Sequence, residues 1–127
     1  MARILVVEDN PVNLKLASVI LRSEGYDTDG AVDAEEASEI IAERRPDLIL
    51  MDLGLPGKDG YQFTRELRQR PETRDVPILA VTSFAMKGDR IKSVEAGCNG
   101  HLTKPIDRMA LLDMVGRLLA APSTVFP

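Results

Sequence analysis

Three short, unbroken apolar runs constrain the fold of this chain more than any other feature of its sequence. They occupy residues 4–7, 48–51 and 78–81. Because the apolar residues are continuous rather than alternating with polar ones, each run is typical of a strand covered on both faces, as in a parallel sheet. The more polar run at 27–32 is typical of an edge strand, and Gly100–Thr103, bounded by Pro105, is predicted as a fifth strand.

Helical periodicity and boundary signals separate these runs. Asn10 and Pro11 form an N-cap and proline pair, which predicts the start of a helix that ends near Gly25. Further helices are predicted over residues 33–46, 61–69 and 87–96, and from an N-cap at Asp107 onward. The segment 122–127, which contains two prolines, is expected to fray.

Strand and helix therefore alternate five times within 127 residues. This order predicts an α/β fold whose parallel sheet is built from right-handed crossovers, and five units are too few for an eight-stranded barrel. An open, doubly wound sheet remains. We expect one domain over residues 1–121, followed by a C-terminal tail at 122–127.

The composition limits the partners that such a domain could bind. The formal net charge is −4, Trp is absent, and Tyr and Phe number 2 and 3, so no nucleic acid and no anionic membrane is expected as a partner. No apolar run approaches a membrane span of about 20 residues, and the N-terminus lacks the pattern of a signal peptide. A single cysteine, Cys98, excludes an internal disulfide framework. We therefore expect a cytoplasmic protein.

Charged and hydroxyl side chains stand at the carboxyl ends of the predicted strands. In chain order these residues are Glu8, Asp9, Asp52, Thr82, Ser83 and Lys104. Because the carboxyl ends of parallel strands meet at one edge of the sheet, where such folds bind ligands, we expect these side chains to lie close together. Each residue alone could be an ordinary cap or loop residue, but the convergence of all of them indicates a site.

The chemistry of such a site follows from its charges. Three adjacent carboxylates repel one another, and a hard divalent cation such as Mg²⁺ removes that penalty. With a lysine and a hydroxyl, the cation can position a phosphoryl group, which an aspartate can accept as an acyl phosphate. Other sites are less well supported: residues 54–59 lack the spacing of a phosphate-binding loop, and His101 is the only histidine, which argues against zinc.

The segments that carry these residues resemble the receiver domain of bacterial two-component response regulators. The resemblance covers residues 3–120 and rests on ILVVEDN at 4–10, DLILMDL at 47–53 with Pro56 and Gly60, AVT at 80–82 and TKP at 103–105. It implies a flavodoxin-like, doubly wound, five-stranded parallel sheet of strand order 2-1-3-4-5 with five helices.

The resemblance also implies a phosphoacceptor and a set of metal ligands. Asp52 would be the phosphoacceptor. Mg²⁺ would be held by Asp9 and Asp52 directly, by the backbone carbonyl of Gly54, and by Glu8 through water.

Further roles implied by the resemblance concern the fourth and fifth strands. Thr82 would be the switch hydroxyl, with Ser83 beside it, and Lys104 would bridge to the phosphoryl group. The Lys104–Pro105 peptide is expected to be cis. One departure is His101 at the switch position, where the family usually has Tyr or Phe. Because imidazole is smaller, polar and titratable near neutral pH, we expect weaker or pH-sensitive coupling there.

The segment that follows Ser83 leads to two expectations about packing. Phe84 is expected to shield one side of the phosphoryl group. Phe84, Met86, Ile91 and Val94 are predicted to be core residues, with a partly exposed docking surface as the alternative.

The implied function is a stand-alone signalling switch and not an enzyme acting on a separate substrate. A histidine kinase or histidine phosphotransfer protein would supply the phosphoryl group, and the domain would promote its own phosphorylation and dephosphorylation. A downstream protein would then bind the surface of the fourth helix, fifth strand and fifth helix. Three alternatives stay open: a phosphotransfer intermediate of a hybrid histidine kinase, an aspartyl-nucleophile phosphohydrolase, which would need a second Asp where Gly54 stands, and a flavin-binding module, which three acids at the phosphate edge disfavour.

Overall fold

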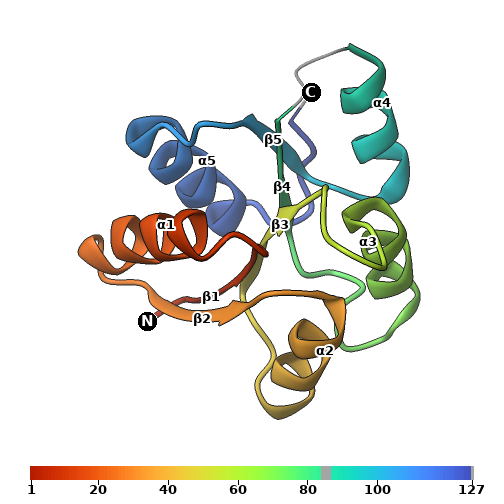
Figure 1. The fold of residues 1–127 in the computed structure, drawn as a ribbon, viewed down its shortest axis with the longest axis horizontal. Coiled ribbons are helices and arrows are strands. Elements are labelled where there is room, and N and C mark those ends of the chain that lie inside the picture. Colours follow the sequence, from red (N-terminus) through yellow and green to blue (C-terminus); the bar gives the residue numbers. More distant parts are fainter. Residues whose placement is uncertain (84–86, 127) are drawn as a thin grey trace.

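Five strands alternate with five helices in the computed structural model, which describes residues 1–83 and 87–126 (Figure 1). The strands are β1 (Arg3–Val7), β2 (Asp27–Ala31), β3 (Leu48–Asp52), β4 (Ile78–Thr82) and β5 (Gly100–Thr103). The helices are α1 (Pro11–Ser23), α2 (Ala34–Glu43), α3 (Gly60–Gln69), α4 (Lys87–Ala96) and α5 (Arg108–Ala120). The alternation predicted from the apolar runs is confirmed, and in the described part of the chain no helix is long and apolar enough to cross a membrane.

All five strands are parallel and lie in the order β2-β1-β3-β4-β5, as the resemblance implied. The register pairs Val7 of β1 with Met51 of β3, and Asp52 of β3 with Val81 of β4. The residues that end these strands therefore lie side by side at one edge of the sheet. This edge carries the predicted site, as expected for a doubly wound sheet.

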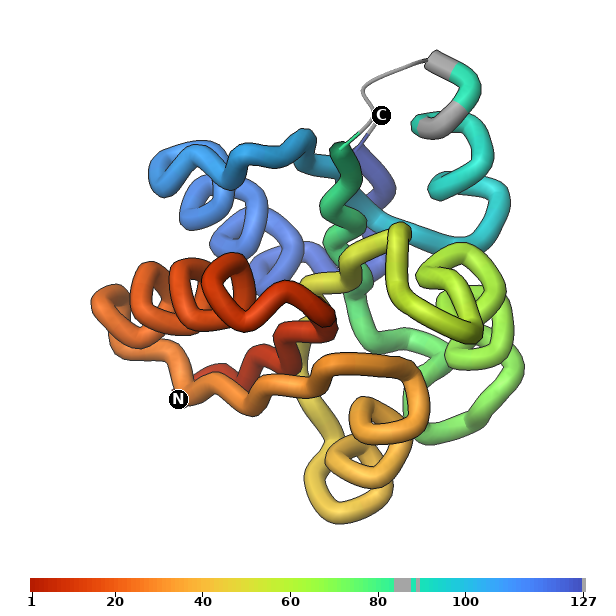
Figure 2. Tube along the Cα trace, in the orientation of Figure 1, coloured from red at the N-terminus to blue at the C-terminus, as the bar shows by residue number. Residues whose placement is uncertain are grey.

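Helices cover both faces of the sheet, with α1 and α5 on one side and α2, α3 and α4 on the other (Figures 1 and 2). Along β1, Ile4 and Val6 pack toward α1 and α5, while Leu5 and Val7 pack against the opposite layer. Successive side chains of a strand point to opposite faces, so two covered faces require apolar residues at every position. This requirement explains the unbroken runs.

Side-chain caps start four of the helices where the sequence turns from strand to helix. Asn10 Oδ1 accepts hydrogen bonds from the backbone N–H groups of Val12 and Asn13, and carboxylates of Asp33, Asp59 and Asp107 cap α2, α3 and α5. The cap at Asp59 was not predicted. These caps satisfy backbone donors that a helix start leaves unpaired.

The structure differs from two packing expectations, which concern the burial of α4 and the fraying of the C-terminal tail. Ile91 and Val94 were predicted to be core residues, but they are 52% and 45% exposed, because α4 buries the small residues Ser93 and Ala96 instead. Phe84 and Met86 lie outside the described residues. The tail was expected to fray, yet residues 122–126 turn back along the domain and are held by hydrogen bonds to Asn99.

The start of α3 packs so closely against the end of β3 that only glycine fits at position 60. A Cβ atom there would lie 2.5 Å from the backbone oxygen of Asp52 and 2.6 Å from the Cα of Leu53. The close approach is fastened by a hydrogen bond from the Gly60 N–H to the Leu53 carbonyl. Gly60 thus fixes the backbone that carries Asp52.

We predict that Gly60→Ala destabilises the domain by about 1–3 kcal/mol, because overpacking forces the backbone of β3 or α3 to shift. Urea denaturation measures the change. The matched control is Gly116→Ala in α5, where a Cβ meets no atom within 4 Å and where alanine should add roughly 0.5–1 kcal/mol of stability. Equal stability of the two variants would contradict the packing described for α3.

Candidate functional site

Three carboxylates meet where β1 and β3 end. Glu8 and Asp9 follow β1 directly, and Asp52 is the last residue of β3. Each of the three offers an oxygen, and these oxygens lie within 4.8 Å of one another. The Glu8 backbone N–H donates to the Ala31 carbonyl, which continues the pairing of β1 with β2 and sets the position of the cluster. Glu8 and Asp52 are buried, whereas Asp9 is exposed to solvent.

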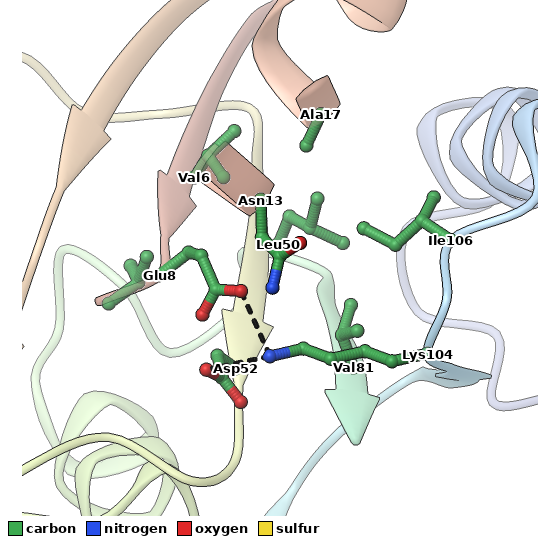
Figure 3. A pocket seen from close by; sticks show the side chains of 10 residues that line it. Val6, Glu8, Asn13, Ala17, Leu50, Asp52, Val81, Lys104 and Ile106 are labelled. Atoms are coloured by element: carbon green, nitrogen blue, oxygen red, sulfur yellow. Dashed lines mark hydrogen bonds and ion pairs between the residues drawn. The ribbon is translucent and has the colours of Figure 1, made fainter. Parts of the chain in front are cut away.

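Lys104 places one ammonium group between two of these carboxylates (Figure 3). Its Nζ lies 2.9 Å from Glu8 Oε1 and 3.2 Å from Asp52 Oδ2. The backbone positions it, because Lys104 follows β5 and its N–H donates to the Thr82 carbonyl. The peptide bond from Lys104 to Pro105 is cis, as expected.

The Asp52 carboxylate is held at both of its oxygens. Oδ1 accepts a hydrogen bond of 3.0 Å from the Gly54 backbone N–H, and Oδ2 accepts one from Lys104. The backbone on either side is also fixed, since the Leu53 N–H donates to the Val81 carbonyl of β4. Asp52 is therefore an oriented carboxylate with one face toward the acidic cluster.

Burial and neighbouring charges separate the pKa values of the two buried acids. Burial and a hydrogen bond with Asp52 raise the pKa of Glu8 to about 7, although Lys104 opposes the shift. Burial would also raise the pKa of Asp52, but hydrogen bonds from Glu8, from the Gly54 N–H and from Lys104 outweigh it and lower that pKa. Below about pH 7, the metal-free site thus holds a proton on Glu8 and the negative charge on Asp52.

The same neighbours also shift the pKa of Lys104. Burial would lower the pKa of Lys104, but its hydrogen bonds to Glu8 and Asp52 and the charges of these two carboxylates together outweigh burial and raise it. Lys104 therefore stays an ammonium ion over the physiological range. It compensates one of the two buried carboxylates and leaves the other dependent on a proton or a second cation.

The structure places the other predicted site residues as follows. Thr82 is buried at the end of β4, next to the Val81 that pairs with Asp52, and Ser83 is exposed just beyond it. His101 does not join the carboxylate cluster. It is half-buried on β5, with its Nδ1 3.4 Å from the Ser93 hydroxyl, and it lines a groove beside α4. Phe84, the expected shield, lies outside the described residues.

One residue of the site was not identified from the sequence. Asn13, in the first turn of α1, lines the same pocket as Glu8, Asp52 and Lys104 (Figure 3). The signal was available, because Asn10 caps the helix and Asn13 stands one turn later on the face toward the strand ends. In the sequence, Asn10 already accounts for the pattern as a helix cap, so Asn13 was not recognised as a residue that lines the pocket.

The donor set fits a hard divalent cation. All the clustered donors are oxygens, which Mg²⁺ prefers, and the exposed Asp9 leaves the cluster open toward solvent. Glu8 Oε2 is buried and, when Glu8 is ionised, receives no hydrogen bond from any of the described residues, so a coordinated ion or its water would satisfy it. The residues present are therefore sufficient for a magnesium site.

The raised pKa of Glu8 predicts how the stability of the metal-free domain depends on pH. The folded-state pKa of about 7 exceeds the ordinary 4.5, so the stability contributed by protonated Glu8 is complete below about pH 4.5 and is lost as pH rises through 7. Between pH 6 and 8 in EDTA we expect a loss on the order of 1 kcal/mol. The lowered pKa of Asp52 affects the stability only at pH values below this window.

Denaturation at pH 6 and at pH 8 measures this loss. Glu8→Gln should remove it, while Glu39→Gln on the exposed face of α2 should retain it. A Glu8→Gln domain with an unchanged pH dependence would show that Glu8 does not carry the proton.

Comparison with known proteins agrees with this geometry. The family model of the response regulator receiver domain matches residues 4–116. The chain is 42% identical over 103 residues to the polar-differentiation response regulator DivK of Brucella anthropi, which covers 81% of this chain and 84% of DivK. It is 40% identical over 117 residues to the response regulator PleD of Caulobacter vibrioides, covering 92% of this chain and 26% of PleD.

Solved structures show the same likeness. The receiver domain of the sensor histidine kinase PA1611 from Pseudomonas aeruginosa, which has a magnesium ion coordinated in its active-site cleft, superposes with a TM-score of 0.87 at 42% identity over 94% of this chain and 98% of that one. The chemotaxis response regulator CheY4 of Vibrio cholerae gives 0.88 at 28% identity over 93% and 98%. From the family model, its relatives and the fold, this chain belongs to the response regulator receiver domain family, the signalling switches of two-component systems.

Proposed function

We propose that this receiver domain accepts a phosphoryl group on Asp52 from a phosphohistidine donor, in a Mg²⁺-dependent reaction that its own residues promote. The observation that carries the proposal is the Asp52 carboxylate, which Gly54 and Lys104 hold at its two oxygens beside two further acids. An oriented, ionised carboxylate next to a cation site is the arrangement that an acyl phosphate requires. The cytoplasm is the compartment proposed for this exchange.

The metal would be held by side chains from two strand ends. Asp9 and Asp52 would ligate Mg²⁺ directly, Glu8 would do so through water, and the Gly54 carbonyl would complete the protein ligands. The close carboxylate oxygens and the unsatisfied Glu8 Oε2 support this assignment. When bound, Mg²⁺ supplies positive charge that neutralises the phosphoryl oxygens.

The transfer step forms one bond and breaks another. A carboxylate oxygen of Asp52 attacks the phosphorus, the P–N bond of the donor breaks, and its electron pair stays on the leaving imidazole. Before the transfer, the Lys104 ammonium is shared between Glu8 and Asp52. Once the phosphoryl group is on Asp52, the ammonium donates a hydrogen bond to a phosphoryl oxygen. The Thr82 hydroxyl donates to another from the end of β4, with Ser83 beside it. Gly54 has no side chain to keep water away, which allows the domain to promote its own dephosphorylation.

Modification would alter the binding of a downstream protein. A phosphoryl group adds about −1.5 to −2 charges and three acceptor oxygens beside β4 and β5. Drawing Thr82 and Lys104 toward it would shift the population of conformations at the surface of α4, β5 and α5. His101 lies on β5 within that surface, so it remains the proposed switch position.

Phosphorylation by acetyl phosphate tests the acceptor without any protein donor. We predict that the domain incorporates one acid-labile phosphoryl group in the presence of Mg²⁺ and none in EDTA, because the metal must offset the carboxylate charge. Intact-mass spectrometry measures the gain. Asp52→Asn should abolish it, whereas Asp47→Asn, at the opposite end of β3, should not. Undiminished labelling of the Asp52→Asn domain would remove Asp52 from the proposed role.

The exposed face of α1 supports a helical protein as the phosphoryl donor. Val12, Leu16 and Val19 are 74%, 45% and 52% exposed and form one apolar stripe together with the stem of Lys15. Because α1 begins directly after the acidic cluster, a protein that brings a histidine to Asp52 must cover the start of this helix. A histidine kinase or a histidine phosphotransfer protein is the proposed partner, in either a stand-alone or a hybrid system.

A change on this stripe should separate protein donors from small donors. We predict that Leu16→Lys slows phosphoryl transfer from histidine kinases by about tenfold, since an apolar anchor of the interface is lost. The rate of transfer is measured with a panel of phosphorylated histidine kinases. Labelling by acetyl phosphate should stay unchanged, because that donor does not contact α1. Val94→Lys on α4 is the control. Equal loss with both donors would mean that Leu16 supports the fold and not the interface.

A further inference from the structure

Among the described residues, the hydrogen bonds that hold the C-terminal tail to the domain converge on Asn99. The Asn99 side chain donates from Nδ2 to the carbonyls of Pro122 and Thr124, at 3.3 Å and 3.2 Å. The Asn99 carbonyl accepts a hydrogen bond of 2.7 Å from the Phe126 N–H. These three bonds fold the tail back from the end of α5 to the start of β5, so that it runs beside β5 (Figures 1 and 2).

Asn99 can hold the tail because the rest of the domain holds Asn99. Its Oδ1 accepts from the Arg68 guanidinium at 2.7 Å and from the Ile78 N–H at 2.9 Å, and its own N–H donates to the Ile78 carbonyl. With Oδ1 occupied by these donors, Nδ2 is directed at the tail. The Asn99 side chain is therefore buried and held in one orientation by its hydrogen bonds.

Phe126, held by this anchor, forms one wall of a groove beside α4. The groove has a volume of about 370 Å³ and is lined by Ile91, Ser93, Val94, Gly100 and His101, together with Phe126 itself. The ring is partly buried and packs against the hydrophobic cluster under α1 and α5. Ile91 and Val94 remain about half exposed at the rim, so the apolar surface extends beyond the area that the tail covers.

We propose that residues 122–126 act as an intramolecular strap that walls the groove between α4 and β5 and competes with the downstream protein for the stretch of surface that it covers beside β5. The groove and this stretch form part of the surface assigned above to the downstream protein, and only this identification rests on the proposed function. A partner that binds beside β5 where the strap lies must first displace Phe126. Its apparent affinity is then reduced by the fraction of molecules in which the strap is open.

The strap is connected to the phosphoryl site by one short strand. Asn99 immediately precedes β5, His101 of β5 lines the groove, and Lys104 follows β5 and contacts Asp52. A change in the position of β5 therefore acts on the strap and on the site together. Because such coupling is reciprocal, closing the strap also changes the conformational balance of the site.

Amide hydrogen exchange in the full, unphosphorylated chain tests the strap without any step of the phosphoryl chemistry. We expect the amide at position 126 to be protected, because it donates to Asn99. Phe126→Ala should lower that protection roughly tenfold by removing the buried ring. Val125→Ala is the control, since Val125 is 47% exposed and should leave protection unchanged. Exchange at the rate of a free peptide in the unaltered chain would overturn the proposal.

A peptide added in trans tests whether the groove is covered. The probe is a synthetic peptide of residues 121–127, titrated into isotope-labelled chains and followed by chemical shifts of α4 and β5. It should bind the Phe126→Ala chain at least about fivefold more tightly than the unaltered chain, whose own strap already occupies the surface beside Asn99 and β5. The same peptide with alanine in place of Phe126 should bind neither. Equal binding of the original peptide to both chains would refute competition, whatever the outcome of phosphorylation at Asp52.

Discussion

The position of the Lys104 ammonium between Glu8 and Asp52 is the interaction on which this site depends. Parallel strands bring their carboxyl ends to one edge, and here that edge carries three acids from two strands. One lysine cannot neutralise them all, so the site holds a proton near neutral pH unless a metal ion replaces it. A buried charge cluster of this kind is a poor means of stabilising a fold. The cluster points instead to the chemistry that an ionised, oriented Asp52 can perform.

The surrounding structure keeps that carboxylate in place. Gly60 lets α3 approach the Asp52 backbone, and the Leu53 N–H ties the same segment to β4. On the other side of the site, the Lys104 N–H donates a hydrogen bond to the Thr82 carbonyl, which connects the end of β5 and its lysine to the end of β4. The same strand continues back to Asn99, which holds the tail. Through β5, the domain therefore links its acidic edge to the groove beside α4.

The sequence predicted the fold and most of the site because both follow from strong patterns. Covered strands must be apolar at every position, and a ligand edge must carry polar residues at the strand ends, which identifies Glu8, Asp52 and Lys104. Features set by tertiary packing were missed. Asn13 lines the pocket, although the sequence pattern there indicated only the helix cap at Asn10. Ile91 and Val94 are apolar yet exposed, and the docking of the tail depends on Asn99, whose orientation Arg68 sets from a distant segment.

The carboxylates at the ends of β1 and β3 form one candidate cation site beside Asp52, the proposed phosphoacceptor. Anomalous X-ray scattering from crystals soaked in Mn²⁺, a spectroscopic substitute for Mg²⁺, locates such a cation directly. We predict one strong anomalous peak within about 2.5 Å of oxygens of both Asp9 and Asp52, with Lys104 displaced from at least one carboxylate. A peak elsewhere on the surface, or an unoccupied cluster with Lys104 still bridging Glu8 and Asp52 at saturating Mn²⁺, would contradict it.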